Sequence, residues 1–336
     1  MTMKAVVHDK FGDPREVLQI RNVSVPEPRR GEVLVRMLAS PINPSDLMSV
    51  AGNYSIVPKL PATPGFEGVG IVEQGRGILG KFMVGKKVAV LNRERGNWSE
   101  KTVTSAKQVI PIPRLMPEDQ AAMSFVNPVT AYVLVRDVLK VPSGAWLVQT
   151  AGNSALGKMI IRLGMNFEFK TLSIIRRQED IEKLKFLGAH EVIVFDIERD
   201  RPEMLIEKIR SVTGGGMKYG LDPIGGELGS ALIRTLGEQG RMVLYGTLSG
   251  EDVHFSSRIL MEAGARIEGF WLGKYMQQLG LFKKLSLIKK TSKLILDGTL
   301  STDDTVEFPL DQIHEAVRAS VQQGYNKKII LRIADS

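Results

Sequence analysis

The chain has 336 residues, which is enough for two domains of ordinary size. Apolar residues make up 43% of it and charged residues 24%, as in a globular protein, and no run of about eighteen apolar residues predicts a membrane span. The absence of cysteine excludes disulfides, thiolate metal sites and a cysteine nucleophile, and the net charge of +8 is spread along the chain, which does not favour nucleic-acid binding.

The first part of the chain, residues 1–124, has the pattern of irregular β structure. The sequence enters a strand pattern at Met1 without a targeting segment before it, which indicates the cytoplasm. Apolar side chains dominate residues 33–38, and proline and glycine recur densely between Pro41 and Gly65. We therefore expect a twisted, barrel-like sheet with long loops.

Strands and helices alternate from about Pro128 onward. The expected strands are Ala145–Gln149, Thr171–Ile175, Glu191–Val194, Tyr219–Asp222, Arg241–Tyr245 and Arg266–Phe270, and the expected helices include Asp180–Leu187, Pro202–Thr213 and Glu227–Leu236. Six such strands predict an α/β fold with a doubly wound parallel sheet over residues 125–268. A lysine-rich helix, a helix at Asp311–Val321 and a strand at Lys328–Ile333 follow, and we expect residues 269–336 to return to the first domain.

A turn of small residues follows the first of these strands. Gly152, Ser154 and Gly157 have the spacing of a dinucleotide-binding turn, although a serine replaces the usual middle glycine. Small residues let the backbone approach a pyrophosphate, whose charge lies at the positive end of the following helix. An ordinary strand-to-helix turn is the alternative interpretation. The turn residues that we assign to the cofactor are Gly152, Asn153, Ser154, Ala155, Leu156 and Gly157.

Two arginines follow the second strand. NAD-binding units normally carry an acid here, which accepts a hydrogen bond from the ribose 2′-hydroxyl. Arg176 and Arg177 instead suit a 2′-phosphate, so the sequence predicts NADPH. The alternative interpretation is that the two arginines are an ordinary solvent-exposed pair that binds no ligand.

No group of residues predicts a metal site. The four histidines are far apart in the sequence, at His8, His190, His254 and His314. The densest cluster of lysines is Lys283, Lys284, Lys289, Lys290 and Lys293, on a stretch with helical spacing. A solvated outer face is the favoured interpretation of this cluster, and attraction of an anionic substrate is the alternative.

Three loop motifs could bring polar groups to a site. They are Ile42–Asp46, Ala51–Tyr54 and Asn127–Tyr132. A reductase without a metal needs a hydride acceptor beside the nicotinamide and usually a group that handles the proton. For any one tyrosine in a loop, the alternative interpretation is that its ring only packs against neighbouring residues and has no catalytic role.

These motifs resemble the zinc-free branch of the medium-chain dehydrogenase/reductase superfamily, which holds quinone reductases and trans-2-enoyl thioester reductases. The resemblance covers essentially the whole chain and is most specific at Ile42–Asp46, Asn127–Tyr132 and Gly269–Leu272. It implies a GroES-like β-barrel catalytic domain at residues 1–124 and a Rossmann domain at residues 125–268. Zinc members carry a histidine in a Gly-His-Glu motif, where this chain has Phe66.

The resemblance also implies roles for individual residues. Tyr54 matches a tyrosine that assists catalysis by hydrogen bonding to the carbonyl oxygen or by supplying the α-proton. Asn43 and Thr130 match residues that line the nicotinamide pocket, and they complete the candidate catalytic set. The other implied cofactor contacts are Asn127, Gly225, Gly226, Tyr245, Gly246, Phe270, Trp271, Leu272 and Lys328, with Lys327 as the alternative to Lys328.

We therefore expect an NADPH-dependent, zinc-independent reductase that acts on the carbon–carbon double bond of an enoyl thioester. Quinone or enone reduction is the alternative, and a non-catalytic NADPH-binding protein is a third possibility. The expected partners are a small-molecule substrate and a second copy of the chain, because edge strands of the nucleotide domain often pair in this family. We expect no nucleic-acid, membrane or metal partner.

Overall fold

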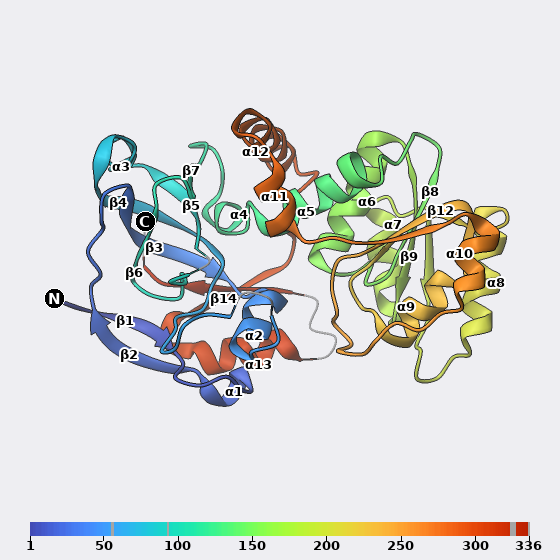
Figure 1. Cartoon of the computed structure of the whole chain (residues 1–336), viewed down its shortest axis with the longest axis horizontal. Helices are drawn as coiled ribbons and strands as arrows, with labels where there is room; N and C mark the ends of the chain where they lie inside the picture. Colours follow the sequence, from blue (N-terminus) through green and yellow to red (C-terminus); the bar gives the residue numbers. More distant parts are fainter. Residues whose placement is uncertain (55–56, 93, 323–326, 335–336) are drawn as a thin grey trace. The chain divides into compact units, whose positions relative to one another are not determined.

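The computed structural model describes residues 1–54, 57–92, 94–322 and 327–334 (Figure 1). The chain divides into two compact units: unit 1 holds residues 1–126 and 302–336, and unit 2 holds residues 127–301. The expected return to the first domain at residue 269 is therefore too early. Residues 269–301 stay with unit 2, where Tyr275 donates a hydrogen bond to Asp137 (2.7 Å) and Arg162 donates one to the carbonyl oxygen of Ser301 (2.9 Å).

Unit 1 is built on a mostly antiparallel sheet in the order β14-β15-β3-β4-β5-β7, with β6 paired to β3. Its strands are β3 (Glu32–Pro41), β4 (Glu67–Gly75), β5 (Lys87–Leu91), β6 (Lys101–Ser105), β7 (Val109–Pro111), β14 (Thr305–Pro309) and β15 (Lys328–Arg332). Val33, Leu34, Val35 and Leu38 of β3 are all buried, because other parts of unit 1 cover both faces of this strand. The apolar run at residues 33–38 thus marks the central strand.

Short helices and a separate pair of strands complete unit 1. These elements are β1 (Thr2–Val7), α1 (Pro14–Val17), β2 (Gln19–Ser24), α2 (Pro44–Val50), α3 (Gly77–Met83), α4 (Glu118–Ala122), η3 (Leu310–Gln312) and α13 (Ile313–Val321). Ile313 and Val317 of α13 pack in one apolar cluster with Val6 of β1 and Leu331 of β15. This cluster joins the C-terminal segment to the N-terminal one, so β15 is part of the core of unit 1.

Unit 2 contains a six-stranded parallel sheet in the order β10-β9-β8-β11-β12-β13. Its strands are β8 (Trp146–Gln149), β9 (Lys170–Ile175), β10 (Glu191–Val194), β11 (Met217–Asp222), β12 (Leu236–Leu244) and β13 (Arg266–Gly269). All six predicted strands are present and form the doubly wound sheet that the sequence predicts. The strands are apolar because helices cover the sheet, and Val148, Leu172, Leu221 and Val243 are fully buried.

The helices of unit 2 connect these strands or flank them in the sequence. They are α5 (Val126–Val133), which begins at the last residue of unit 1, η1 (Leu134–Val138), α6 (Ala155–Phe167), η2 (Gln178–Asp180), α7 (Ile181–Phe186), α8 (Pro202–Thr213), α9 (Gly226–Ile233), α10 (Ser257–Ala263), α11 (Leu272–Gln278) and α12 (Leu281–Leu296). The helix expected at Glu227–Leu236 ends earlier, because Thr235 folds back to donate to the carbonyl oxygen of Leu232 and Leu236 already pairs in the sheet. Within the described residues, no helix is long and apolar enough to cross a membrane.

Candidate active site

The sheet order of unit 2 reverses at β8. The chain runs from β8 to β9 on one side and later to β11 on the other side. In such sheets the connections leave in opposite directions beyond the carboxyl ends of the two central strands, and ligands bind in the crevice between them. Thr150 follows β8 and Asp222 ends β11, so both residues lie at this switch point.

The turn after β8 has no room for a side chain at either of its two glycines. A Cβ atom on Gly152 would lie 2.5 Å from the Cβ atom of Ser173 on β9, and one on Gly157 would lie 2.6 Å from the carbonyl oxygens of Ala151 and Gly152. Ser154 has an ordinary extended backbone with φ of −68°, so this position does not require glycine. Its hydroxyl oxygen instead accepts a hydrogen bond from the Gly157 N–H (3.0 Å) and caps α6. Serine can therefore replace the usual middle glycine, because it fits the backbone at this position and caps the helix.

The start of α6 can receive an anion. Ser154 satisfies the Gly157 N–H, whereas the N–H groups of Ala155 and Leu156 lie in the first turn, where an α-helix supplies no acceptor. Free N–H groups and the helix dipole at this end favour a phosphate. The narrow glycine turn and the capped helix thus fit a nicotinamide dinucleotide.

The two arginines after β9 differ in their surroundings. Arg177 forms an ion pair with Glu179 (3.1 Å), and the neighbouring Asn153 donates its side-chain amide to Asp180 (2.7 Å). Arg176 is exposed and has no hydrogen bond or ion pair within the parts of the chain that the structure describes. Arg176 is therefore the more available of the two cations for a phosphate.

Asp222 organises the turn after β11, and sequence reasoning did not identify it. The hydroxyl of Thr150 donates to one carboxylate oxygen, which also accepts the Ile224 N–H (3.0 Å), and the other oxygen accepts the Gly225 N–H (2.9 Å). Burial raises the pKa of Asp222 above its ordinary value, against the effect of these hydrogen bonds. The carboxyl group links β8 to the turn that contains Gly225 and Gly226, whose φ values of 75° and 56° favour glycine.

The predicted residues after β12 and β13 lie at the same carboxyl edge. The Tyr245 N–H donates to the carbonyl oxygen of Asp222 (3.0 Å), and a Cβ atom on Gly246 would lie 2.6 Å from the carbonyl oxygen of Pro223. Burial raises the pKa of the Tyr245 phenol, so the phenol is neutral. Phe270, Trp271 and Leu272 follow β13 and lead into α11. The structure thus brings the cofactor residues predicted after β8, β9, β11, β12 and β13 to one edge of the sheet.

Unit 1 contains a buried polar cluster around Asn43, which precedes α2. The Lys328 ammonium donates to the carbonyl oxygen of Ile42 (2.9 Å) and to the Asn43 side-chain oxygen. The Asn43 amide nitrogen donates to Glu67 (3.0 Å). Asn43 and Glu67 are both 2% exposed. Asn43 and Lys328, which the resemblance assigns to the nicotinamide pocket, therefore hydrogen-bond within unit 1.

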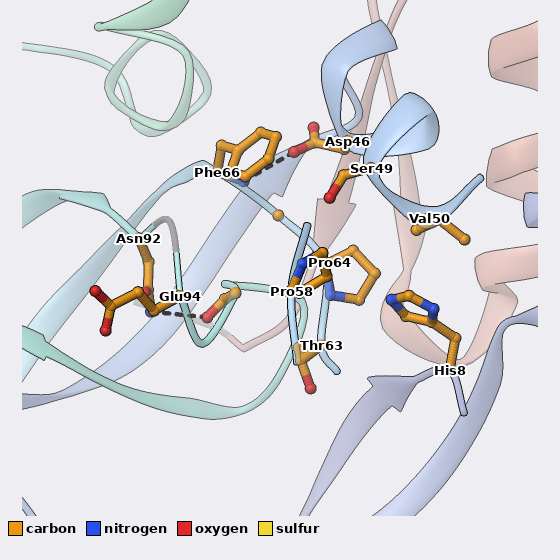
Figure 2. Close-up of a pocket in the computed structure, with 12 residues that line it drawn as sticks. His8, Asp46, Ser49, Val50, Pro58, Thr63, Pro64, Phe66, Asn92 and Glu94 are labelled. Carbon is orange, nitrogen blue, oxygen red and sulfur yellow. Dashed lines mark hydrogen bonds between the residues drawn. The ribbon is translucent and has the colours of Figure 1, made fainter. Parts of the chain in front are cut away.

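Asp46, another residue whose role the sequence did not indicate, completes this cluster. One of its carboxylate oxygens accepts the Asn43 N–H (2.8 Å), and the other accepts the Phe66 N–H (2.8 Å), which Figure 2 shows as a dashed line. Burial raises the pKa of Asp46 to about 7, partly offset by these two hydrogen bonds. Burial also raises the pKa of Glu67 and lowers that of Lys328.

Tyr54 lies on the loop that follows α2 and is half-buried. Its ring packs on Phe66, with ring centroids 5.4 Å apart. A pocket beside this loop is lined by Asp46, Ser49 and His8, among others, and holds about 20 Å³ (Figure 2). This volume is enough for an ordered water molecule but not for a substrate.

Asn127 and Thr130 both lie on α5. Glu67 accepts the N–H of Val126 (2.9 Å), which is the first residue of this helix and the last residue of unit 1. Thr130 is buried and Asn127 is half-buried.

Zinc-type ligands are not grouped in the described parts of the chain. No cluster of three or more histidine, aspartate or glutamate side chains there could hold a metal ion. The Nδ1 atom of His8 faces the carbonyl oxygen of Lys10 (3.1 Å), and His8 as a whole is 1% exposed. A carbonyl oxygen only accepts, so Nδ1 carries the proton in this contact.

Comparisons with known proteins agree with this architecture. The model of the alcohol dehydrogenase GroES-like domain matches residues 29–114, and that of the zinc-binding dehydrogenase matches residues 155–289. The mitochondrial enoyl-[acyl-carrier-protein] reductase of Mus musculus is 33% identical over 98% of this chain and 88% of that protein.

Solved structures extend the likeness to the whole fold. A putative NADPH:quinone reductase from Bacillus thuringiensis has a TM-score of 0.90 at 31% identity and covers 99% of this chain and 100% of that one. Etr1p from Candida tropicalis, in complex with NADP and crotonyl-CoA, has a TM-score of 0.85 at 25% identity, over 99% of this chain and 100% of that one. The predicted pairing of a GroES-like domain with a Rossmann domain is confirmed.

Both family models match and the mouse relative is similar along nearly the entire length, so this chain belongs to the medium-chain dehydrogenase/reductase superfamily, in the zinc-free branch of enoyl thioester reductases and quinone oxidoreductases.

Proposed function

We propose that this oxidoreductase uses NADPH to reduce the carbon–carbon double bond of a trans-2-enoyl thioester. The observation that carries this proposal is the 33% identity over 98% of the chain to an enoyl-[acyl-carrier-protein] reductase. The half-buried Tyr54 on its loop supports the same chemistry, because it offers a phenol without involving a metal.

The preference for NADPH rests on the end of β9. NADPH differs from NADH by a 2′-phosphate, and a free guanidinium group such as that of Arg176 can bind this phosphate through charge-assisted hydrogen bonds. The same position holds no acid that would accept a hydrogen bond from a ribose hydroxyl, since Arg176 and Arg177 directly follow the strand.

The turn from Gly152 to Gly157 and the guanidinium of Arg176 would hold NADPH, which would supply a hydride for the β-carbon of the substrate. Tyr54 would donate a hydrogen bond to the thioester carbonyl oxygen, where negative charge develops during the reduction. A proton then adds to the α-carbon, either from Tyr54 or from water, so the double bond gains one hydride and one proton in total. An ordinary tyrosine, with a pKa near ~10, is protonated at neutral pH and can perform either task.

Independence from zinc is supported by the donor groups of unit 1. Phe66, which stands where zinc-dependent members carry a histidine, has no ligand atom and packs on Tyr54. The cluster beside it already contains a cation, because the Lys328 ammonium donates to Asn43. A metal ion would therefore have to displace an ammonium that is already hydrogen-bonded.

The experiment that tests this function follows NADPH oxidation by the purified protein with a short trans-2-enoyl thioester. We expect NADPH-dependent turnover, weak activity with NADH, and no loss of rate after treatment with a chelator. NADPH binding without oxidation of any unsaturated carbonyl compound would contradict the proposal and favour a non-catalytic NADPH-binding protein.

Quinone reduction is a second candidate, because the putative quinone reductase from Bacillus thuringiensis has a TM-score of 0.90 to this chain. A small quinone in the same assay separates the two functions. Turnover of the quinone alone would replace the thioester as the proposed substrate.

We further propose that the protein is a homodimer. Strand β13 is the last strand of the parallel sheet and pairs on one side with β12 alone within the described residues. A free strand edge is a ready surface for pairing with a second copy. Light scattering that gives the mass of a single chain would contradict this assembly. The cytoplasmic location stays a prediction, which cell fractionation would test.

A further inference from the structure

Helix α3 of unit 1 presents apolar side chains to solvent. Ile78 is 94% exposed and Phe82 is 66% exposed, and because they are four positions apart they share one face of the helix. Leu79 and Val84, beside them in the sequence, are exposed as well. Single exposed apolar residues are ordinary at a protein surface, whereas a group of them on one short element indicates an interaction site.

The opposite face of α3 attaches the helix to unit 1. Met83 is buried in one apolar cluster with Val33 of β3 and Val72 of β4. Gly80 is buried too, and it lies so close to Gly75 of β4 that a Cβ atom on Gly75 would collide with the Gly80 carbonyl group. The helix therefore rests directly on the sheet, beside β4 in Figure 1, and this contact directs Ile78 and Phe82 outward.

Basic side chains surround the exposed apolar group. Arg76 precedes α3, Lys81 lies on it and Lys86 follows it. The Lys86 ammonium lies 3.2 Å from the centre of the Phe82 ring. Arg30 is on the adjacent turn and is exposed. We call these four cations, together with the apolar residues at positions 78, 79, 82 and 84, the α3 patch.

The positive charge of the α3 patch is not neutralised by the acids of the adjoining strands. Glu32 of β3 forms an ion pair with Arg95 (3.3 Å), and Glu73 of β4 forms one with Lys101 (2.6 Å). In the parts of the chain that the structure describes, none of the four cations of the patch has an ion pair. The patch therefore attracts an anionic partner.

We propose that the α3 patch binds the surface of an anionic lipid bilayer. Ile78 and Phe82 enter the boundary between headgroups and acyl chains, and the surrounding cations lie at the lipid phosphates. A protein partner needs roughly 800 Å² of complementary surface on each side. Helix α3 has only seven residues, and Ile78 stands almost free of neighbours, which suits a lipid surface that requires no matching shape.

This attachment is peripheral and differs from a membrane span. The expectation of no membrane partner rests on the absence of a long apolar run, which a helix lying at the interface does not need. A few apolar side chains and cations give reversible binding that salt weakens. The proposal does not depend on the reaction that the protein catalyses.

The first experiment is flotation of the full-length protein with lipid vesicles. The protein should float with vesicles of equal parts phosphatidylcholine and phosphatidylglycerol, remain behind with phosphatidylcholine alone, and be released by high salt. Phe82→Ser should lower the partition coefficient roughly tenfold, because a large apolar side chain no longer leaves water. Lys81→Glu should lower it by a similar factor, because one charge is reversed.

The lysine-rich helix α12 supplies matched controls. Phe282 is 86% exposed on this helix, and Lys289 is exposed there as well. Phe282→Ser and Lys289→Glu remove the same chemical groups from another basic surface, and they should keep the partition coefficient within about twofold of the wild type. All four variants should retain the wild-type Tm and the wild-type Kd for NADPH, because the substituted side chains are exposed and lie outside the cofactor residues.

A second measurement reports insertion directly. In Phe82→Trp, the added tryptophan emission should shift to shorter wavelength with the anionic vesicles, because the indole leaves water for the interface. Phe282→Trp should show no such shift. The wild-type protein, which has three tryptophans, supplies the background spectrum.

Three results would overturn the inference. The first is no flotation of the wild-type protein with anionic vesicles. The second is flotation that the α12 variants weaken as much as Phe82→Ser and Lys81→Glu do, which would assign the binding to overall charge or to α12. The third is a lower mass of Phe82→Ser in light scattering, which would show that a second copy of the chain covers the patch. If Phe82→Ser does not fold, Lys81→Glu and Phe82→Trp carry the same test.

Discussion

Arg176→Ala is expected to reduce the selectivity for NADPH over NADH. Arg176 is exposed at the end of β9 and has no partner within the described residues, whereas Arg177 is paired with Glu179 at 3.1 Å. A hydrogen bond to a charged group contributes roughly 1.5–3 kcal/mol, and solvent screening at an exposed site favours the lower end. About 1.5–2 kcal/mol corresponds to a roughly ten- to thirtyfold rise in the Kd for NADPH.

The assay is a titration of cofactor fluorescence with both nucleotides, for Arg176→Ala and for Arg177→Ala. The Kd for NADH should stay within about twofold, because NADH has no 2′-phosphate. Arg177→Ala should have the smaller effect, since Glu179 already neutralises part of its charge, and the selectivity should decrease at high salt. Equal weakening of both nucleotides by Arg176→Ala, or a larger effect of Arg177→Ala, would refute this reasoning.

Three further predictions concern the reaction, the turn and the buried acid. Tyr54→Phe should lower kcat about a hundredfold or more while the Kd for NADPH stays within about twofold, and an unchanged rate would remove Tyr54 from the mechanism. Gly157→Ala should weaken the binding of both nucleotides in the same titration, because the new Cβ atom would lie 2.6 Å from two carbonyl oxygens, and unchanged binding would show that the turn can widen. The pKa of Asp46 is raised to about 7, so the folded state binds its proton more tightly than the unfolded state. The free energy of unfolding should therefore fall by up to a few kcal/mol as the pH rises from about 4 through 7. Asp46→Asn should flatten this dependence in urea unfolding at several pH values, and an equally steep dependence in the variant would assign it to other groups.

The sheet of unit 2 follows directly from local sequence patterns. Each strand is a short apolar run bounded by glycine or polar residues, and the alternation with helices restricts the chain to a doubly wound parallel sheet. The turn at Gly152–Gly157 and the arginines after β9 were also recognisable, because both lie within a single βαβ unit. These features can be predicted because each depends on residues that are close together in the sequence.

The buried cluster of unit 1 could not be derived in the same way. Lys328 and Asn43 are 285 positions apart, and Asn43 and Glu67 are 24 apart, so only the pairing of distant strands brings them together. Asp46 lies in a loop motif that the sequence singles out, and Asp222 ends a predicted strand, but the sequence assigned neither residue a role of its own. Their raised pKa values arise from burial, which a local pattern does not show. The end of unit 2 at residue 301, rather than 268, likewise depends on contacts from α6 and η1 to α11 and to the residues after α12.

The sequence by itself therefore determined the fold class, because periodicity is encoded within a few turns of chain. Glycine spacing predicted the candidate cofactor turn, and the resemblance of a loop motif predicted the candidate tyrosine. The tertiary structure decided which of the two arginines is free, why serine can stand in the glycine turn, and that Asn43 and Lys328 hydrogen-bond to one another inside unit 1. Those properties arise from hydrogen bonds and burial between segments distant in the sequence, and their strength depends on exclusion from water.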